Sequence, residues 1–359
     1  MNSQLHNQYI PNIVSPPGET LQETLEFLGL SQSDLAERTG RPKKTINEII
    51  QGKTAITPET ALQFERVLGV PASFWNNRES QYRAWMARMN EQGKLGRSPN
   101  WLKRIPVTSM ANHGWIRKLL DPVEQLKEVL NFFGVASPEL VEPNEQVAFR
   151  KSQSFDSDPW SLSAWLRKGV LEAQQMQCSP FDAEKFSTTL QQIRKITVDS
   201  PDVFVPKLQK LCSECGIAVV FVPELPRAMV SGATYWLSPV KAVIQLSLRY
   251  KTDDHLWFTF FHEAGHILLH GKREVFLEGG KDRNIDLREG EANQFAADLL
   301  IDSTNFAKLH CKDKISKADV QRFANDIGIA PGIVVGRLQH EKLLRYNYLN
   351  DLKRKLRWR

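Results

Sequence analysis

The chain has few cysteines and no long apolar run. Four cysteines in 359 residues are too few for the disulfide framework of a small secreted protein. Two of them form one CxxC at residues 212–215, and a zinc knuckle needs a second such pair. No apolar run approaches the roughly 20 residues of a membrane-spanning helix, and residues 1–15 lack the apolar segment of a signal peptide. We therefore expect a cytoplasmic protein with no membrane contact.

The composition is that of a globular protein with a basic balance. Hydrophobic residues make up 41% and charged residues 25%, which allows a buried core and argues against bulk disorder. The formal net charge is +6, which permits binding to phosphate backbones without requiring it. The length allows two or three domains of roughly 100–200 residues each.

The patterning divides the chain into four segments. Helical periodicity dominates residues 18–92, and a stretch rich in Gly, Ser, Pro and Asn follows at 93–100. Short β-branched runs then predict strands at 217–222, 230–237 and 242–248. We predict a mainly α protein with a small α+β domain, and its segments are a five-helix bundle at 16–92, a helical connecting region at 101–210, a zincin-like unit with a short sheet at 211–302 and a helical extension at 303–359.

Residues 32–51 have the pattern of a helix-turn-helix. Ser31 can cap the first helix with its hydroxyl, and Ala36 is small where a second helix must cross. Gly40 stands at the turn, where positive φ is usual. Ile46 and Ile49 are three apart and can anchor the second helix in the core. The segment therefore predicts two helices held at a close crossing.

The polar residues of this segment suit a recognition helix in the DNA major groove. Lysine can contact phosphates or guanine, and asparagine or glutamine can contact adenine edges. The alternative is a helical bundle that binds protein. We favour binding to double-stranded DNA because Ala36, Gly40 and the Ile46–Ile49 pair all stand where the helix-turn-helix pattern requires them. The expected DNA contacts are Gln32, Lys43, Lys44, Thr45, Asn47 and Gln51.

Three stretches of this region resemble a known family. Residues 15–21 (SPPGETL), 30–36 (LSQSDLA) and 56–62 (ITPETAL) resemble the HigA-type antitoxins of the Xre helix-turn-helix superfamily, over roughly residues 16–82. The resemblance implies a homodimer that binds a palindromic operator and represses transcription, often with a small toxin as partner. The chain continues far beyond the length of a free-standing antitoxin.

A second motif, HEAGH, lies at residues 262–266 on a predicted apolar helix at 256–269. His262 and His266 are four apart, so both rings project from one helix face and can bind one metal ion. Glu263 lies between them, where it can act as general base toward the attacking water. Gly265 would let another backbone approach the helix closely. The motif predicts a catalytic zinc site.

A catalytic zinc site needs a third protein ligand, which a second predicted helix at 289–301 can supply. On that helix Glu291, Phe295 and Leu299 share one face, and the two apolar residues suggest that this face is buried. We therefore expect Glu291 to be the ligand. Glu289 is the second choice because it is rotated away by about 200°. The other downstream acids are Glu274, Glu278, Asp282, Asp286 and Asp298.

The order of these motifs is similar to that of the ImmA/IrrE metallopeptidases. Residues 231–233 (SGA), 243–246 (VIQL), 258–270 (FTFFHEAGHILLH) and 291–297 (EANQFAA) carry the resemblance, which covers about 211–300. It implies one zinc ion per chain. It also implies His262, His266 and Glu291 as ligands and Glu263 as the catalytic glutamate. The family's usual Leu-Leu-Met-Pro ending is Leu-Leu-Ile-Asp at 299–302.

Two hypotheses for the whole chain follow. The first is a transcriptional regulator whose zinc endopeptidase domain cleaves a regulatory protein, either a repressor or this chain itself near residues 93–100. The second is a HigA-type autorepressor or antitoxin whose zinc domain is a sensor or scaffold and cleaves nothing. The role of His270 stays open between a contact at the edge of the metal site and a helix-terminal position near the negative dipole end.

Overall fold

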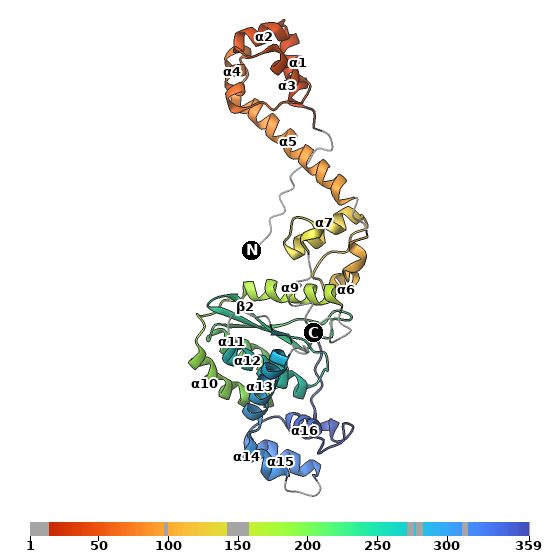
Figure 1. Cartoon of the computed structure of the whole chain (residues 1–359), viewed down its shortest axis with the longest axis vertical. Coiled ribbons are helices and arrows are strands. Elements are labelled where there is room, and N and C mark those ends of the chain that lie inside the picture. Colours follow the sequence, from red (N-terminus) through yellow and green to blue (C-terminus); the bar gives the residue numbers. More distant parts are fainter. Residues whose placement is uncertain are drawn as a thin grey trace. The chain divides into compact units, whose positions relative to one another are not determined.

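The computed structural model describes residues 14–96, 100–141, 158–270, 276–277, 283–310 and 315–358. The chain divides into two compact units, Met1–Ser98 and Pro99–Arg359, and Figure 1 shows the elements of each. None of the helices in these described ranges combines the length and the apolar character that crossing a membrane requires.

The first unit is the expected five-helix bundle. Its core contains Leu21, Leu35, Ile46 and Phe64, all with no exposed surface, and Trp75 packs edge-on against Phe64 with ring centroids 5.5 Å apart. The helices are α1 (Pro17–Leu28), α2 (Gln32–Thr39), α3 (Lys43–Ile50), α4 (Pro58–Leu68) and α5 (Ala72–Leu95).

The turn between α2 and α3 has the expected local chemistry. Ser31 caps α2: its hydroxyl accepts the Asp34 amide at 3.1 Å, and the Asp34 carboxylate accepts the Ser31 amide at 2.8 Å. Gly40 ends α2 with φ 67°, a conformation that costs glycine little. Pro42 precedes α3 as its N-cap. These local signals place the boundaries because they depend on neighbouring residues alone.

The second unit contains a small mixed sheet with strand order β1-β3-β2-β4. β1 (Ile217–Phe221) pairs in parallel with β3 (Lys241–Leu246), and β3 pairs antiparallel with β2 (Gly232–Ser238). These are the three expected strands. The fourth, β4 (Phe276–Leu277), pairs antiparallel with β2 at Ala233 and Thr234; two residues are too few to give a recognisable pattern.

Helices pack on both faces of this sheet (Figure 1). On α9, the Trp165 indole donates to the Val222 carbonyl at 3.0 Å, and the Gln245 amide donates to the Trp165 carbonyl at 2.7 Å. A helix of the predicted connecting region thus packs directly on the sheet. The elements before the sheet are η1 (Leu102–Arg104), α6 (Val107–Asn112), α7 (Pro122–Phe133), η2 (Pro138–Leu140), α9 (Pro159–Gln175), α10 (Ala183–Lys195), η3 (Ile196–Val198) and α11 (Pro201–Ser213).

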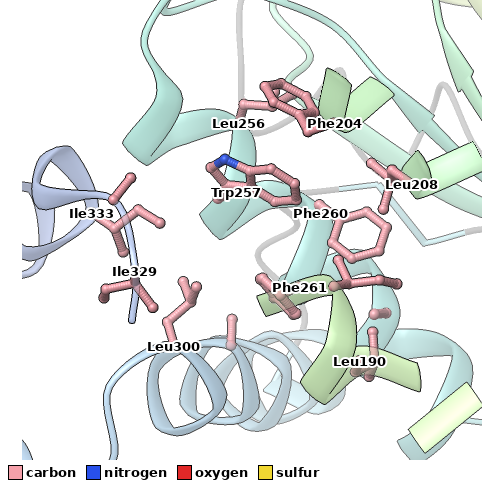
Figure 2. Packing of buried hydrophobic residues seen from close by; sticks show 14 of the residues in the cluster. Leu190, Phe204, Leu208, Leu256, Trp257, Phe260, Phe261, Leu300, Ile329 and Ile333 are labelled. Carbon is pink, nitrogen blue, oxygen red and sulfur yellow. The ribbon is translucent and has the colours of Figure 1, made fainter. Parts of the chain in front are cut away.

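The main core surrounds helix α12 (Asp253–Leu269). Trp257 and Phe260 have no exposed surface, and the Trp257 ring lies 4.8 Å from that of Phe204 on α11. Figure 2 shows these aromatic side chains between residues of α10 and α11 on one side and Leu300 and Ile333 on the other. The remaining elements are α13 (Arg283–Leu300), α14 (Ser303–His310), α15 (Lys317–Ile327), α16 (Pro331–His340) and η4 (Asn350–Leu352).

Candidate metal centre and nucleic-acid interface

Helix α12 brings its two histidines together in the interior of the second unit. His262 and His266 are each 1% exposed. Their Nε2 atoms are 3.0 Å apart, with ring centroids at 4.6 Å. Because residues four apart lie one above the other on a helix, the helix itself fixes this convergence. The two Nε2 atoms therefore face the same point.

Glu289, on α13, completes the group. Its Oε2 lies 3.2 Å from His262 Nε2, and its Oε1 lies 3.6 Å from His266 Nε2. Ligand atoms about 2.0–2.1 Å from a tetrahedral zinc ion would be about 3.3 Å from one another. The three separations of 3.0, 3.2 and 3.6 Å match that edge length. Two imidazoles and one carboxylate thus form a donor set that fits a metal ion.

The expectation that Glu291 joins the histidines is corrected by this geometry. Glu291 instead accepts a hydrogen bond from His270 Nε2 at 2.9 Å, and its side chain is 63% exposed. Among the described side chains of α13, Ala292, Ala296, Ala297 and Leu300 are buried, and Glu289 is half-buried. The periodicity argument chose the face with Phe295 and Leu299, whereas Glu289 lies in line with the small residues Ala292 and Ala296.

Gly265 is where α13 comes closest to α12, through Ala292 and Phe295. A Cβ atom on Gly265 would lie 3.3 Å from Ala292 Cα and 3.1 Å from the Phe295 ring. The expected close approach of another backbone is therefore present. α13 also begins at Arg283, before the expected start, so Glu289 lies within the helix and has a fixed direction.

The His262 ring is oriented from its other nitrogen. Its Nδ1 lies 3.0 Å from Asn293 Oδ1, and Asn293 is one helical turn after Glu289. A neutral imidazole that offers Nε2 to a metal carries its proton on Nδ1. Nδ1 then donates to the Asn293 oxygen, the kind of contact that fixes a ligating histidine. Sequence reasoning missed Asn293, although its spacing of four from Glu289 was available as a signal.

The His266 ring is oriented by a chain of two contacts. His266 Nδ1 lies 2.9 Å from His270 Nδ1, and His270 Nε2 lies 2.9 Å from Glu291 Oε2. With Nε2 of His266 directed at a metal, its Nδ1 donates to His270 Nδ1, and His270 Nε2 donates to Glu291. His270 therefore contacts a candidate ligand on the side away from the metal and helps to orient the ring of that ligand.

The electrostatics favour a neutral histidine and a charged carboxylate. Burial lowers the pKa of His266 because desolvation penalises the imidazolium. Burial acts to raise the pKa of Glu289, but hydrogen bonds and charge interactions with the two histidines outweigh it and lower that pKa to about 2. Both states are those that a metal requires of its ligands.

Glu263 lies between the histidines in sequence and beneath the sheet in space. It has no exposed surface. A Cβ atom on Gly232, the first residue of β2, would lie 2.7 Å from Glu263 Oε1. The Thr234 hydroxyl donates to the Glu263 carbonyl at 3.2 Å. The start of β2 therefore holds this turn of α12 and leaves no room for a side chain over the carboxylate.

In the first unit, α3 presents part of the expected DNA-contact set on one exposed side. Lys43, Asn47 and Gln51 are exposed and spaced by four, and the Gln51 amide donates to Asn47 Oδ1 at 3.0 Å. Lys44 is exposed beside them, with its Nζ 3.9 Å from a Glu48 carboxylate oxygen. Such a pair is too exposed to restrict the lysine strongly.

The two other expected contacts are less exposed. Thr45 is half-buried, and Gln32 is half-buried at the start of α2, where its amide lies 3.4 Å from Gln22 Oε1. Both residues lie in the first turn of a helix. Their contacts with DNA remain predictions.

Two family matches cover the two units. Residues 21–75 match the helix-turn-helix family, and residues 212–339 match the family described as IrrE N-terminal-like domain, peptidase family M78. Among curated proteins, virulence-associated protein I of Dichelobacter nodosus is 38% identical over 77 residues, which are 21% of this chain and 71% of that protein. The HTH-type transcriptional regulator YddM of Escherichia coli K12 is 32% identical over 69 residues, which are 19% and 70%.

A solved structure is also similar in sequence to the first unit. An addiction module antidote protein of the HigA family from Coxiella burnetii is 31% identical, with 24% of this chain and 94% of that chain covered and a TM-score of 0.22. The chain belongs to the helix-turn-helix family of DNA-binding proteins and carries an M78, IrrE-like domain, which implies a metallopeptidase-type enzyme with a metal cofactor. Both resemblances found in the sequence are confirmed.

Proposed function

We propose that this chain is a DNA-binding regulator whose IrrE-like domain is a zinc-dependent endopeptidase that cleaves a regulatory protein. The observation that carries the proposal is the convergence of His262, His266 and Glu289 within 3.0–3.6 Å, beside the buried Glu263. Two histidines and one carboxylate are the protein ligands of many catalytic zinc sites, which keep one further position open.

The protein groups divide the hydrolysis between them. Zinc, when bound, supplies the Lewis acidity that polarises the scissile carbonyl. Glu263 accepts a proton from the attacking water as its oxygen bonds to the carbonyl carbon. Glu263 then gives that proton to the nitrogen as the C–N bond breaks. Asn293 holds His262, and His270 holds His266, at the distances given above.

The first unit directs this activity to operator DNA. The exposed side of α3, with Lys43, Lys44 and Asn47, supports binding in the major groove. We expect a homodimer on a palindromic site, as is usual for this motif. The substrate is a repressor or the chain itself at residues 93–100; a small toxin is a further candidate partner.

The test uses the purified full-length protein loaded with zinc. Wild type and Glu263→Gln are incubated alone and with candidate repressors, and fragments are identified by mass spectrometry. Asp298→Asn is the matched control because Asp298 lies on the same helix as Glu289, is exposed and contacts Gln294 rather than a metal ligand. We expect fragments from wild type and the control and none from Glu263→Gln.

Identical fragments from wild type and Glu263→Gln would contradict the proposal. So would the absence of fragments from wild type combined with normal promoter repression by Glu263→Gln. That second result would favour the autorepressor hypothesis, in which the metal domain is a sensor or scaffold.

A further inference from the structure

Two adjoining cavities have volumes of about 430 and 590 Å³. The first lies between α12, α13 and α16, and the second lies between α12, α16 and the segment at residues 346–355. They share five lining residues, which join them into one cleft: Tyr250, Asp254, His255, Gly336 and His340. Ligand sites commonly have volumes of about 300–1,000 Å³. The cleft is therefore large enough for several residues of an extended peptide.

The first cavity is lined by residues that neighbour the candidate metal ligands along α12 and α13. It is lined by Gly290, which directly follows Glu289, and by Asn293, whose side chain contacts His262 Nδ1 at 3.0 Å. It is also lined by Phe258, one turn before His262 on α12. A chain that enters this cavity thus lies against residues one position from Glu289 in α13 and one helical turn from His262 in α12.

The two ends of the cleft differ in chemistry. The wall of the first cavity includes five apolar side chains, which come from α12, α13, the residue after α13, and α16: Phe258, Ala297, Leu300, Ile301 and Ile333. Figure 2 shows Leu300 and Ile333 on facing elements of this region. An apolar wall of this kind favours an apolar guest, because each buried leucine- or phenylalanine-sized side chain gains about 1.5–3 kcal/mol on leaving water.

The second cavity is richer in basic groups. Lys353 lines it and is neutralised by Asp254, with Nζ 2.7 Å from Oδ2. Lys355 lines it as well and is exposed. Over the whole cleft Arg337, Lys353 and Lys355 outnumber Asp254 and Glu341 by one charge, and the exposed His340 adds a further donor. An acidic group is the natural partner of that excess charge.

We propose that this cleft is the substrate-specificity site of the proposed peptidase. The first cavity takes a leucine- or phenylalanine-sized side chain of the substrate next to the scissile bond. The second cavity takes an acidic residue that follows, near Lys355 and His340. This inference rests on the proposed function, since it names the peptide sequence that the metal centre acts on.

The test measures peptide binding separately from cleavage. The probes are acetylated tetrapeptide amides Gly-Xaa-Asp-Gly, with Leu, Phe or Ala at Xaa, and the Leu peptide with Asn in place of Asp. Binding to the full-length, zinc-loaded Glu263→Gln protein is followed by saturation-transfer NMR. We expect the Leu and Phe peptides to bind, the Ala peptide to bind about tenfold more weakly, and the Asn peptide to bind a few-fold more weakly than its Asp counterpart.

Two variants locate the binding. Gln294 is exposed and lines the first cavity, so Gln294→Trp should fill it and abolish the difference between Leu and Ala. Leu287→Trp, at an exposed position of the same helix outside the cavity lining, is the matched control and should bind like the parent. Lys355→Glu should reverse the preference for Asp over Asn.

Equal binding of the Leu and Ala peptides, or unchanged binding by Gln294→Trp, would overturn the proposal. Because the probe protein carries Glu263→Gln, the result does not depend on peptidase activity. Selective binding with no cleavage by wild type would remove the proposed function and keep the cleft as a ligand site. Cleavage by wild type without selective peptide binding would keep the proposed function and remove the cleft as the specificity site.

Discussion

Gly265 of α12 lies so close to Phe295 of α13 that a Cβ atom on the glycine would be 3.1 Å from the ring. This contact sets how near Glu289, on α13, can come to His262 and His266. The spacing of two helices thus controls the assembly of the candidate metal centre. A change at Gly265 should therefore alter both the packing of α12 against α13 and the distance from Glu289 to the histidines.

Replacing Gly265 by valine should push the helices apart. We expect Gly265→Val to lower the free energy of unfolding of the second unit by about 1–3 kcal/mol and to weaken zinc binding. Chemical denaturation and metal analysis check both effects. Gly93→Ala is the control, because nothing lies within 4 Å of a Cβ at Gly93 and helix propensity should favour alanine. Full zinc affinity in Gly265→Val would contradict the coupling.

The two glutamates of α13 should differ in their effect on zinc affinity. Glu289→Gln removes a charged donor from the histidine pair and should lower zinc affinity more than about 100-fold. Glu291→Gln disturbs only the contact with His270 and should lower it by about tenfold, as typical for groups behind a ligand. Competition with a chelator of known affinity measures both. If Glu291→Gln caused the larger loss, the ligand would be Glu291, as the periodicity of the sequence suggested.

Lys43 and Lys44 should contribute to DNA binding through phosphate contacts. Changing both to alanine should weaken binding and reduce the slope of log affinity against log salt by up to about 2, because counterion release scales with the number of phosphates neutralised. Fluorescence anisotropy with promoter DNA at several salt concentrations measures the slope. Arg66→Ala is the control, since Arg66 is exposed on α4. An unchanged slope in the double variant would place both lysines away from the backbone.

Asp253 should make stability depend on pH. Burial raises its pKa from 3.8 to about 6, although the Arg354 amide donates to its carboxylate at 2.9 Å. Because the folded-state pKa lies above the unfolded value, the charged form costs about 3 kcal/mol above pH 6, and this cost disappears as pH falls from 6 to 4. Asp253→Asn keeps the acceptor oxygen and removes the charge.

We therefore expect Asp253→Asn to raise the free energy of unfolding by about 1–3 kcal/mol at pH 8 and by much less at pH 4. Urea denaturation at the two pH values measures the difference. Asp326→Asn, at an exposed position on α15, should show no comparable change. A destabilised Asp253→Asn protein at pH 8 would mean that the charge itself is needed for the fold.

The sequence predicted features that depend on a few neighbouring residues. Ser31 and Gly40 placed the ends of α2, and the spacing of four placed His262 and His266 on one face. Glu289 could not be found in this way, because its direction depends on which face of α13 meets α12. That face is set by the fit of Ala292 and Phe295 against Gly265, which is a property of the two packed helices and cannot be read from the pattern of either one.

The donors of the candidate metal centre come from two helices separated by a long stretch of chain, with His262 on α12 and Glu289 on α13. Any ion that they hold would act as a cross-link that forms only in the folded domain. Its binding energy would then add to the cohesion of this helix pair, by about 4 kcal/mol when free metal is 1,000-fold above the dissociation constant. Metal supply in the cell would in that way set how long the domain survives proteolysis, before any substrate is met.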